Sequence, residues 1–155
     1  LPHLVWQPTD LLEHHSGINA WRDEVQLPNL NTPLVLDVSR RFWPCENMDA
    51  VFTANTLHIM SWTNVALLFE RFQTVLNPMA TVCIYGPFNY NGNYTSDSNA
   101  NFDQWLKNRD PLSGIRDIEA VMVLAENAGL RLLKDNAMPA NNRLLVLQKL
   151  GSALA

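Results

Sequence analysis

The sequence predicts an α/β fold with a mostly parallel sheet that ends in an antiparallel hairpin. Short apolar runs alternate with segments of helical periodicity, as is typical of strand–helix–strand units in a parallel sheet. Near the C-terminus, two strand-like runs at 130–136 and 144–148 are joined by a connection so short that they can only pair antiparallel. We expect a single domain over 1–150, followed by a frayed tail at 151–155.

The first half of the chain is predicted to contain three strands and two helices. The strands are expected at 3–7, 34–38 (buried) and 50–54, and the helices at 12–25 and 63–76. In both helices the apolar residues recur three and four positions apart and should face a core. These residues are Leu11, Ile18, Trp21 and Val25 in the first helix, and Val65, Leu68, Phe69, Phe72, Val75 and Leu76 in the second.

The second half is predicted to begin with a core strand at 81–85. The Asn-rich stretch 89–101 follows; it is too long for a minimal connection, and such loops are usually functional or mobile. A short helix is expected at about 99–108. Another should open at Asp117 and end at Gly129, which stands in the position of a C-cap glycine.

Polar residues follow the apolar runs. They are Asp10, Asp37, Asn55 and Asn89. Parallel sheets bind ligands beyond the carboxyl ends of their strands, so we expect these side chains to line one crevice. The pattern points to a nucleotide-type ligand.

Composition narrows the classes of partner. The net charge of −4, with 17% charged residues and no basic run, argues against a nucleic-acid surface held by charge. No apolar run approaches the ~20 residues of a membrane span. Cys45 and Cys83 form no metal or redox motif, no metal site is expected, and a reducing cytoplasm is the default location. The oligomeric state is left open.

A doubly wound nucleotide site normally begins with a strand and a glycine-rich turn, about 20 residues before an acidic residue that binds the ribose. Asp10 has the context of that acid, but counting back from it passes Leu1. We therefore expect the first strand, its glycine turn and the following helix to lie upstream of Leu1, so that the strands seen here are the second to the seventh.

Several stretches resemble a known family. They are Trp-Gln-Pro-Thr-Asp at 6–10, Phe-Thr-Ala-Asn-Thr-Leu-His-Ile-Met at 52–60, Tyr-Gly-Pro-Phe-Asn at 85–89, Thr-Ser-x-Ser-Asn-x-x-Phe-Asp at 95–103, Gly-Ile-Arg-Asp at 114–117 and Met-Pro-Ala-Asn-Asn at 138–142. With the closing hairpin, the chain resembles class I S-adenosylmethionine-dependent methyltransferases, in particular the family that includes methyltransferase-like protein 26. The resemblance implies a Rossmann-like fold, S-adenosylmethionine as cofactor, and methyl transfer. The acidic net charge, and the absence of an Asn/Asp-Pro-Pro-aromatic motif at Asn55-Thr56-Leu57-His58, favour a small molecule or a protein as the methyl acceptor. The chain departs from the family in lacking the glycine motif.

The resemblance assigns cofactor contacts to four residues, and each acidic residue also has an alternative role. Asp10 would accept the two ribose hydroxyls; alternatively, it caps the helix at 12–25. Asp37 and Val38 would hold the adenine, whereas Asp37 alternatively caps its own loop. Asn55 would bind the carboxylate or the amine of the cofactor.

Catalytic and substrate roles follow from position. His58 is a candidate general base; the alternative is a histidine at a helix start, bonded to backbone. Candidate substrate contacts are Asn89, Tyr90, Tyr94, Asn141 and Asn142, whose alternative roles are turn formation and solvation. Arg116 and Asp117 are expected to form a salt bridge at the helix start; alternatively, they hold an acidic substrate. The rival function is a non-catalytic methyltransferase-like protein that binds a nucleoside ligand or a protein partner.

Overall fold

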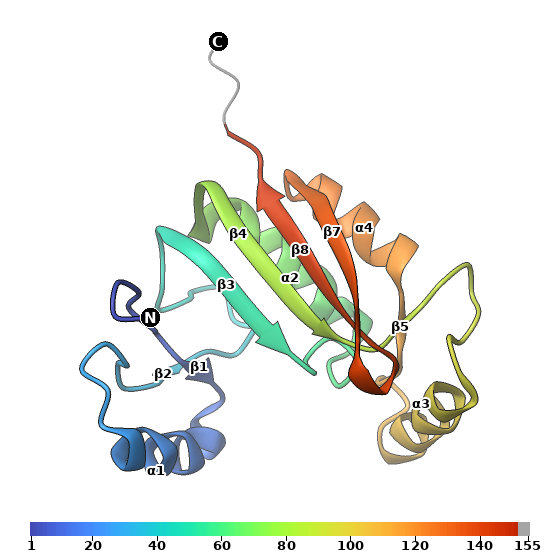
Figure 1. Ribbon diagram of the computed structural model, residues 1–155, viewed down its shortest axis with the longest axis horizontal. Coiled ribbons are helices and arrows are strands. Elements are labelled where there is room, and N and C mark those ends of the chain that lie inside the picture. The colour runs from blue at the N-terminus through green and yellow to red at the C-terminus, as the bar shows by residue number, and fades with distance from the viewer. Residues whose placement is uncertain (152–155) are drawn as a thin grey trace. The chain divides into compact units, whose positions relative to one another are not determined.

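The computed structural model describes residues 1–151, so 152–155 of the expected tail lie outside the described residues. The chain divides into two compact units, Leu1–Cys45 and Glu46–Ala155. We call them the N-terminal and the C-terminal unit and describe each by itself (Figure 1). The single domain expected over 1–150 stays a prediction.

The N-terminal unit is a parallel pair of short strands with one helix between them. β1 (Thr9–Asp10) pairs with β2 (Leu34–Val35), and a 3-10 turn (Leu12–His14) leads into α1 (His15–Val25). The helix expected at 12–25 is confirmed. The strand expected at 3–7 is wrong: only Trp6 forms a bridge there, and Pro8, which has no amide hydrogen, separates it from β1.

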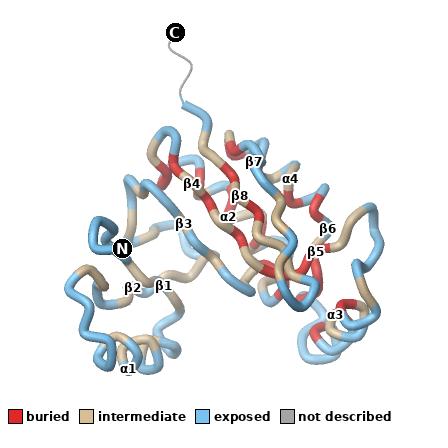
Figure 2. The backbone as a smooth tube through the Cα atoms, in the orientation of Figure 1, coloured by how far each residue is buried: buried red, intermediate tan, exposed pale blue. Residues whose placement is uncertain are grey.

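Burial in the N-terminal unit differs from expectation. None of residues 1–45 is buried (Figure 2). The strand expected at 34–38 is only two residues long, and Val35 is exposed. The predicted inward face of α1 is also wrong, since Trp21 is 70% exposed and Val25 is exposed as well. The two-residue strands offer this helix too little apolar surface within the unit.

The C-terminal unit is built on a four-stranded mixed sheet in the order β3-β4-β8-β7 (Figure 1). Its strands are β3 (Met48–Ala54), β4 (Leu76–Gly86), β7 (Leu130–Met138) and β8 (Asn142–Lys149). β3 and β4 are parallel, whereas β8 runs antiparallel to both β4 and β7. The predicted hairpin is confirmed, and its strands are joined by a 3-10 turn (Pro139–Asn141).

The remaining elements are α2 (Trp62–Val75), β5 (Phe88–Asn89), α3 (Asp97–Arg109), β6 (Arg116–Asp117) and α4 (Ile118–Asn127). The helices expected at 63–76 and from Asp117 are confirmed. α3 begins earlier than expected because the Ser96 hydroxyl caps it, accepting a hydrogen bond from the Asn99 amide. β4 begins five residues earlier than expected, directly after α2, with an irregular register against the start of β3.

The core lies between the sheet and the helices α2 and α4, which lie together on one of its faces (Figure 1). Many of its most buried side chains come from α2, β4, α4 and β8, and they include Val65, Phe69, Phe72, Val82, Ile84, Val121, Leu145 and Leu147. The predicted α/β fold with a C-terminal antiparallel hairpin is thus confirmed. No helix in residues 1–151 is both long and apolar enough to cross a membrane.

Candidate functional site

Asn55 and His58 both lie close to Gly86, at the carboxyl ends of β3 and β4. Asn55 directly follows β3 in the left-handed conformation (φ 56°), which asparagine tolerates well. Its backbone N–H donates a hydrogen bond to the carbonyl of Tyr85 at 2.8 Å. A Cβ atom placed on Gly86, the last residue of β4, would lie 3.6 Å from His58 Nδ1 and 3.9 Å from Asn55 Oδ1. Both polar atoms therefore lie within van der Waals distance of the same backbone position.

His58 is buried, with 5% of its surface exposed. Its ring stands edge-on to Phe102 of α3, with the ring centroids 5.3 Å apart. Burial, and secondarily the charge of Arg116, lowers the pKa of His58 to about 4. The imidazole is therefore neutral at neutral pH. None of the described residues hydrogen-bonds to the ring, so the alternative of a ring bonded to backbone is wrong.

The turn that carries His58 is held by the segment around β6. Four consecutive carbonyls, those of 57–60, accept hydrogen bonds from 113–116, a segment we call the clasp. The bonds are Arg116 Nε to Leu57 O (3.1 Å), Gly114 N to His58 O (2.8 Å), Ser113 Oγ to Ile59 O (3.1 Å) and Arg116 Nη2 to Met60 O. Within the described part of the chain Arg116 forms no ion pair, so the salt bridge expected with Asp117 is wrong.

Asn89 and Tyr90 lie at the start of the Asn-rich stretch 89–101, which we call the polar stretch. Tyr90 Oη donates to Asp135 Oδ2 at 2.7 Å, and Arg143 Nε donates to Asp135 Oδ1 at 2.7 Å. Burial and the bond to Asp135 raise the pKa of Tyr90 to about 12. Asn89 Oδ1 is buried without a hydrogen-bond partner among the described residues. A buried oxygen without a donor is costly unless a ligand or water satisfies it.

The hairpin turn lies beside the polar stretch. Asn99 Nδ2 donates to Asn141 O at 3.3 Å, and Asn141 Nδ2 donates to Ser98 Oγ at 3.1 Å. Asn142 Nδ2 reaches the hydroxyl of Tyr85, near the end of β4, at 3.2 Å. Asn141 also has left-handed geometry (φ 57°), so its alternative role in the turn is realised too.

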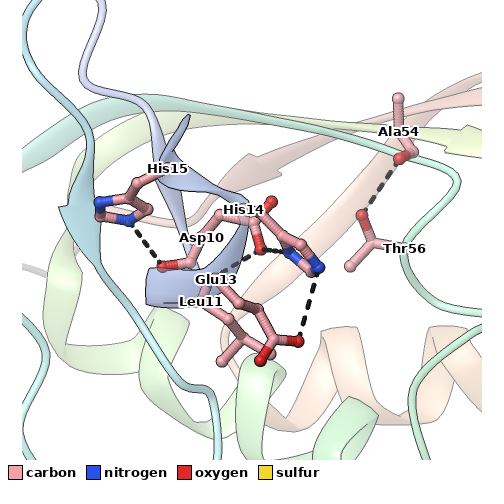
Figure 3. Close-up of polar contacts among 7 residues, drawn as sticks. All are labelled: Asp10, Leu11, Glu13, His14, His15, Ala54 and Thr56. Atoms are coloured by element: carbon pink, nitrogen blue, oxygen red, sulfur yellow. Dashed lines mark hydrogen bonds and ion pairs between the residues drawn. The ribbon is translucent and has the colours of Figure 1, made fainter. Parts of the chain in front are cut away.

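In the N-terminal unit, Asp10 ends β1 and bonds within its own segment. Its Oδ1 accepts from Leu11 N at 2.7 Å and from His14 Nδ1 at 2.8 Å (Figure 3). Both bonds use the same oxygen, and the side chain is 43% exposed. The hydrogen bond and the charge of Asp10 raise the pKa of His14. A second carboxylate oxygen at the strand end thus remains able to accept a donor.

Asp37 lies two residues beyond β2. Its Oδ1 accepts from Ser39 Oγ at 2.6 Å and from Ser39 N at 2.9 Å, and these bonds lower the pKa of Asp37. This is the loop-capping geometry considered as its alternative role. Val38 is partly buried beside it. The single crevice expected to be lined by Asp10, Asp37, Asn55 and Asn89 stays a prediction.

Sequence reasoning did not assign a functional role to Asp103. It is 2% exposed and bonds to Tyr94 of the polar stretch. Its spacing to Lys107, four residues later on the same helix, was the available signal, because oppositely charged residues at i and i+4 meet on a helix face. Its burial and its link to Tyr94 had no such signal.

Comparison with known proteins places this architecture in a family. A family model described as "Protein of unknown function (DUF938)" matches residues 1–149. The chain belongs to the DUF938 family. Membership in the family of methyltransferase-like protein 26 stays a prediction.

Solved structures with the same fold as this DUF938 chain include methyltransferases. An O-methyltransferase family protein from Burkholderia thailandensis is 14% identical, with a TM-score of 0.86 over 97% of this chain and 45% of that one. Human N-acetylserotonin methyltransferase, in complex with SAM, is 15% identical, with a TM-score of 0.71 over 93% of this chain and 40% of that one. The chain thus has the expected Rossmann-like fold and spans less than half the length of these proteins.

Proposed function

We propose that this chain forms the cofactor- and acceptor-binding part of an S-adenosylmethionine-dependent methyltransferase. The observation that carries the proposal is that Asn55 Oδ1 and His58 Nδ1 both lie close to Gly86, at the carboxyl ends of two parallel strands. Ligands bind at this edge in α/β sheets. Methyltransferases of the same fold, one of them in complex with SAM, support the choice of cofactor.

The residues present fit the cofactor. Asp10 has a half-exposed carboxylate with one oxygen unused by its neighbours, which suits a ribose hydroxyl donor. Asn55 offers an amide beside Gly86 for the amino-acid end of the cofactor, and Asp37 with Val38 would border the adenine. When bound, S-adenosylmethionine supplies an electrophilic methyl group, so the chain's main task is to align the acceptor.

We further propose a small-molecule or protein acceptor held by Asn89, Tyr90, Tyr94, Asn141 and Asn142. The unpartnered Oδ1 of Asn89 can accept a hydrogen bond from a hydroxyl or an amine of the substrate to be methylated. His58, neutral at neutral pH, would take the proton that the acceptor loses. The net charge of −4 disfavours a nucleic-acid acceptor.

The proposal keeps the additional glycine-turn strand and a cytoplasmic location. Among the residues that the structure describes, β3 pairs only with β4, so its other edge can take a further parallel strand. Phe52 on β3 is exposed, and an additional segment packed against β3 would bury it. Cys45 and Cys83 are both unpaired, as in a reducing compartment.

The test is binding of S-adenosylhomocysteine, measured by isothermal titration calorimetry. Asp10→Ala should weaken binding about tenfold, because it removes a hydrogen bond to a charged group. Asp23→Ala removes an exposed carboxylate on α1 and is the matched control, expected to bind as the wild type does. No binding by the wild type, or equal binding by both variants, would contradict the proposal.

The burial of His58 favours a second candidate, a non-catalytic protein that binds a nucleoside ligand. With 5% exposure and Phe102 against its ring, His58 offers an acceptor little access. Binding of S-adenosylhomocysteine without methyl transfer to any of a broad panel of small-molecule and protein acceptors would support this candidate. Transfer that is lost in His58→Gln would exclude it.

A further inference from the structure

Asp103 holds a buried carboxylate at the junction of three segments. It lies on α3 and is 2% exposed. It accepts hydrogen bonds from Tyr94 Oη of the polar stretch at 2.6 Å, from Lys107 Nζ at 2.6 Å and from the amide of Ile115 at 2.7 Å. A carboxylate taken out of water needs such donors, and each of the three comes from a different part of the C-terminal unit.

The carboxylate of Asp103 is ionised at neutral pH. Burial by itself would raise its pKa, but the hydrogen bonds from Lys107, Tyr94 and Ile115 outweigh burial and leave the pKa below its ordinary value. A charged acceptor makes stronger hydrogen bonds than a neutral one. Losing any one donor would therefore leave the buried charge of Asp103 less well compensated, which the surrounding segments can relieve only by moving.

Two connections lead from Asp103 to His58. Ile115 belongs to the clasp, 113–116, whose neighbouring Gly114 donates its amide to the carbonyl of His58. Phe102, the residue before Asp103 on α3, packs its ring against the imidazole of His58. Asp103 thus fixes both the backbone that supports His58 and the ring that covers it.

We propose that Asp103 is a positioning residue. Through its hydrogen bond to Tyr94, it couples the conformation of the polar stretch to the orientation of the His58 ring. An acceptor bound under this stretch orders Tyr94, and Tyr94 then holds Asp103 and, through it, the clasp and Phe102. The inference rests on the proposed function only in giving His58 a role in proton transfer. The coupling itself is a property of the chain without ligand.

The test compares two tyrosine hydroxyls of the same stretch. Tyr94→Phe removes the hydroxyl bound to Asp103, whereas Tyr90→Phe removes the hydroxyl bound to Asp135 and is the matched control. The readouts on the unliganded chain are the NMR resonance of His58 Cε1–H, its pH titration, and hydrogen exchange of the Gly114 amide. Tyr94→Phe should shift the resonance and speed the exchange about tenfold. Tyr90→Phe should change neither.

A purely structural role for Asp103 predicts a different result. Tyr94→Phe would then lower the urea midpoint of unfolding without moving the resonance or the titration of His58, and this outcome would overturn the proposal. Equal changes at His58 in both tyrosine variants would overturn it too. Lys107→Met, which removes a donor on an exposed helix position, is the second variant and should also move the His58 resonance. No measurement here uses cofactor or acceptor, so a failed binding test leaves the result interpretable.

Discussion

The two units use similar sequence patterns with different results. α1 and α2 both carry apolar residues at helical spacing, yet α1 has no buried residue whereas α2 has five. α2 packs in a unit with strands of up to eleven residues, while the strands of the N-terminal unit are two residues long. The difference shows that an amphipathic pattern specifies which face of a helix can be buried, and that the available surface decides whether it is.

Replacing one aromatic residue in each unit should show the largest contrast. Phe72→Ala removes a side chain that is 1% exposed in α2, so we expect a loss of about 3–5 kcal/mol in the free energy of unfolding. Trp21→Ala, at a position 70% exposed in α1, should cost less than about 0.5 kcal/mol. Urea unfolding followed by circular dichroism measures both. If both variants lost a similar free energy of unfolding, Trp21 would be buried in solution, and the two units would not differ in this respect.

The pKa values of two histidines, one in each unit, should be shifted in opposite directions from the ordinary value. The pKa of His58 is lowered from 6.5 to about 4 by burial, whereas the bond to Asp10 raises the pKa of His14. Between pH 4 and pH 6.5 the unfolded chain binds a proton at His58 and the folded chain does not. Stability should therefore fall from pH 6.5 to pH 4, by about 3 kcal/mol at 1.36 kcal/mol per pKa unit.

NMR titration gives the two midpoints, and urea unfolding at several pH values gives the slope. The stability that His14 contributes has the opposite sign of dependence: it is present below pH 6.5 and lost as the pH rises through its folded pKa. His58→Gln should flatten the loss between pH 6.5 and pH 4. A loss that persists unchanged in this variant would assign it to other groups.

Two glycine substitutions should show the smallest contrast, with opposite signs. Gly17→Ala in α1 meets nothing within 4 Å and should stabilise the protein by about 0.5–1 kcal/mol, because alanine loses less backbone entropy in a helix. At Gly114, a Cβ would lie 3.0 Å from Asp103 Oδ1 and 3.1 Å from Lys107 Cε. Gly114→Ala should cost about 1–2 kcal/mol. Thermal unfolding measures both, and a stabilising Gly114→Ala would refute the close packing around Asp103.

Local patterns predicted much of the C-terminal unit. The stripe on α2, the position of Gly129 (φ 70°) after α4, and the short link in the hairpin each depend on residues close together in sequence. The same reasoning failed at 3–7 and 34–38, because an apolar run shows what can pair or be buried but not the length of strand available to it.

The candidate site was predicted in part. Asn55 and His58 were found because they follow a strand, and the structure brings their polar atoms to the same glycine. Asp103 was not assigned a functional role, since its three donors come from residues 9 to 12 positions away as well as from its own helix. Arg116 was assigned an ion pair, but its guanidinium instead binds backbone carbonyls of 57 and 60.

The sequence by itself determined the class of fold, the helices α2 and α4, the closing hairpin and the polar strand ends of this DUF938 protein. Periodicity and turn chemistry act over a few residues and can be read directly. Only the tertiary structure decided that His58 is buried and neutral, that the clasp supports its turn, and that Asp103 joins the clasp to the polar stretch. Those properties arise from desolvation and from hydrogen bonds between distant segments, which no local pattern encodes.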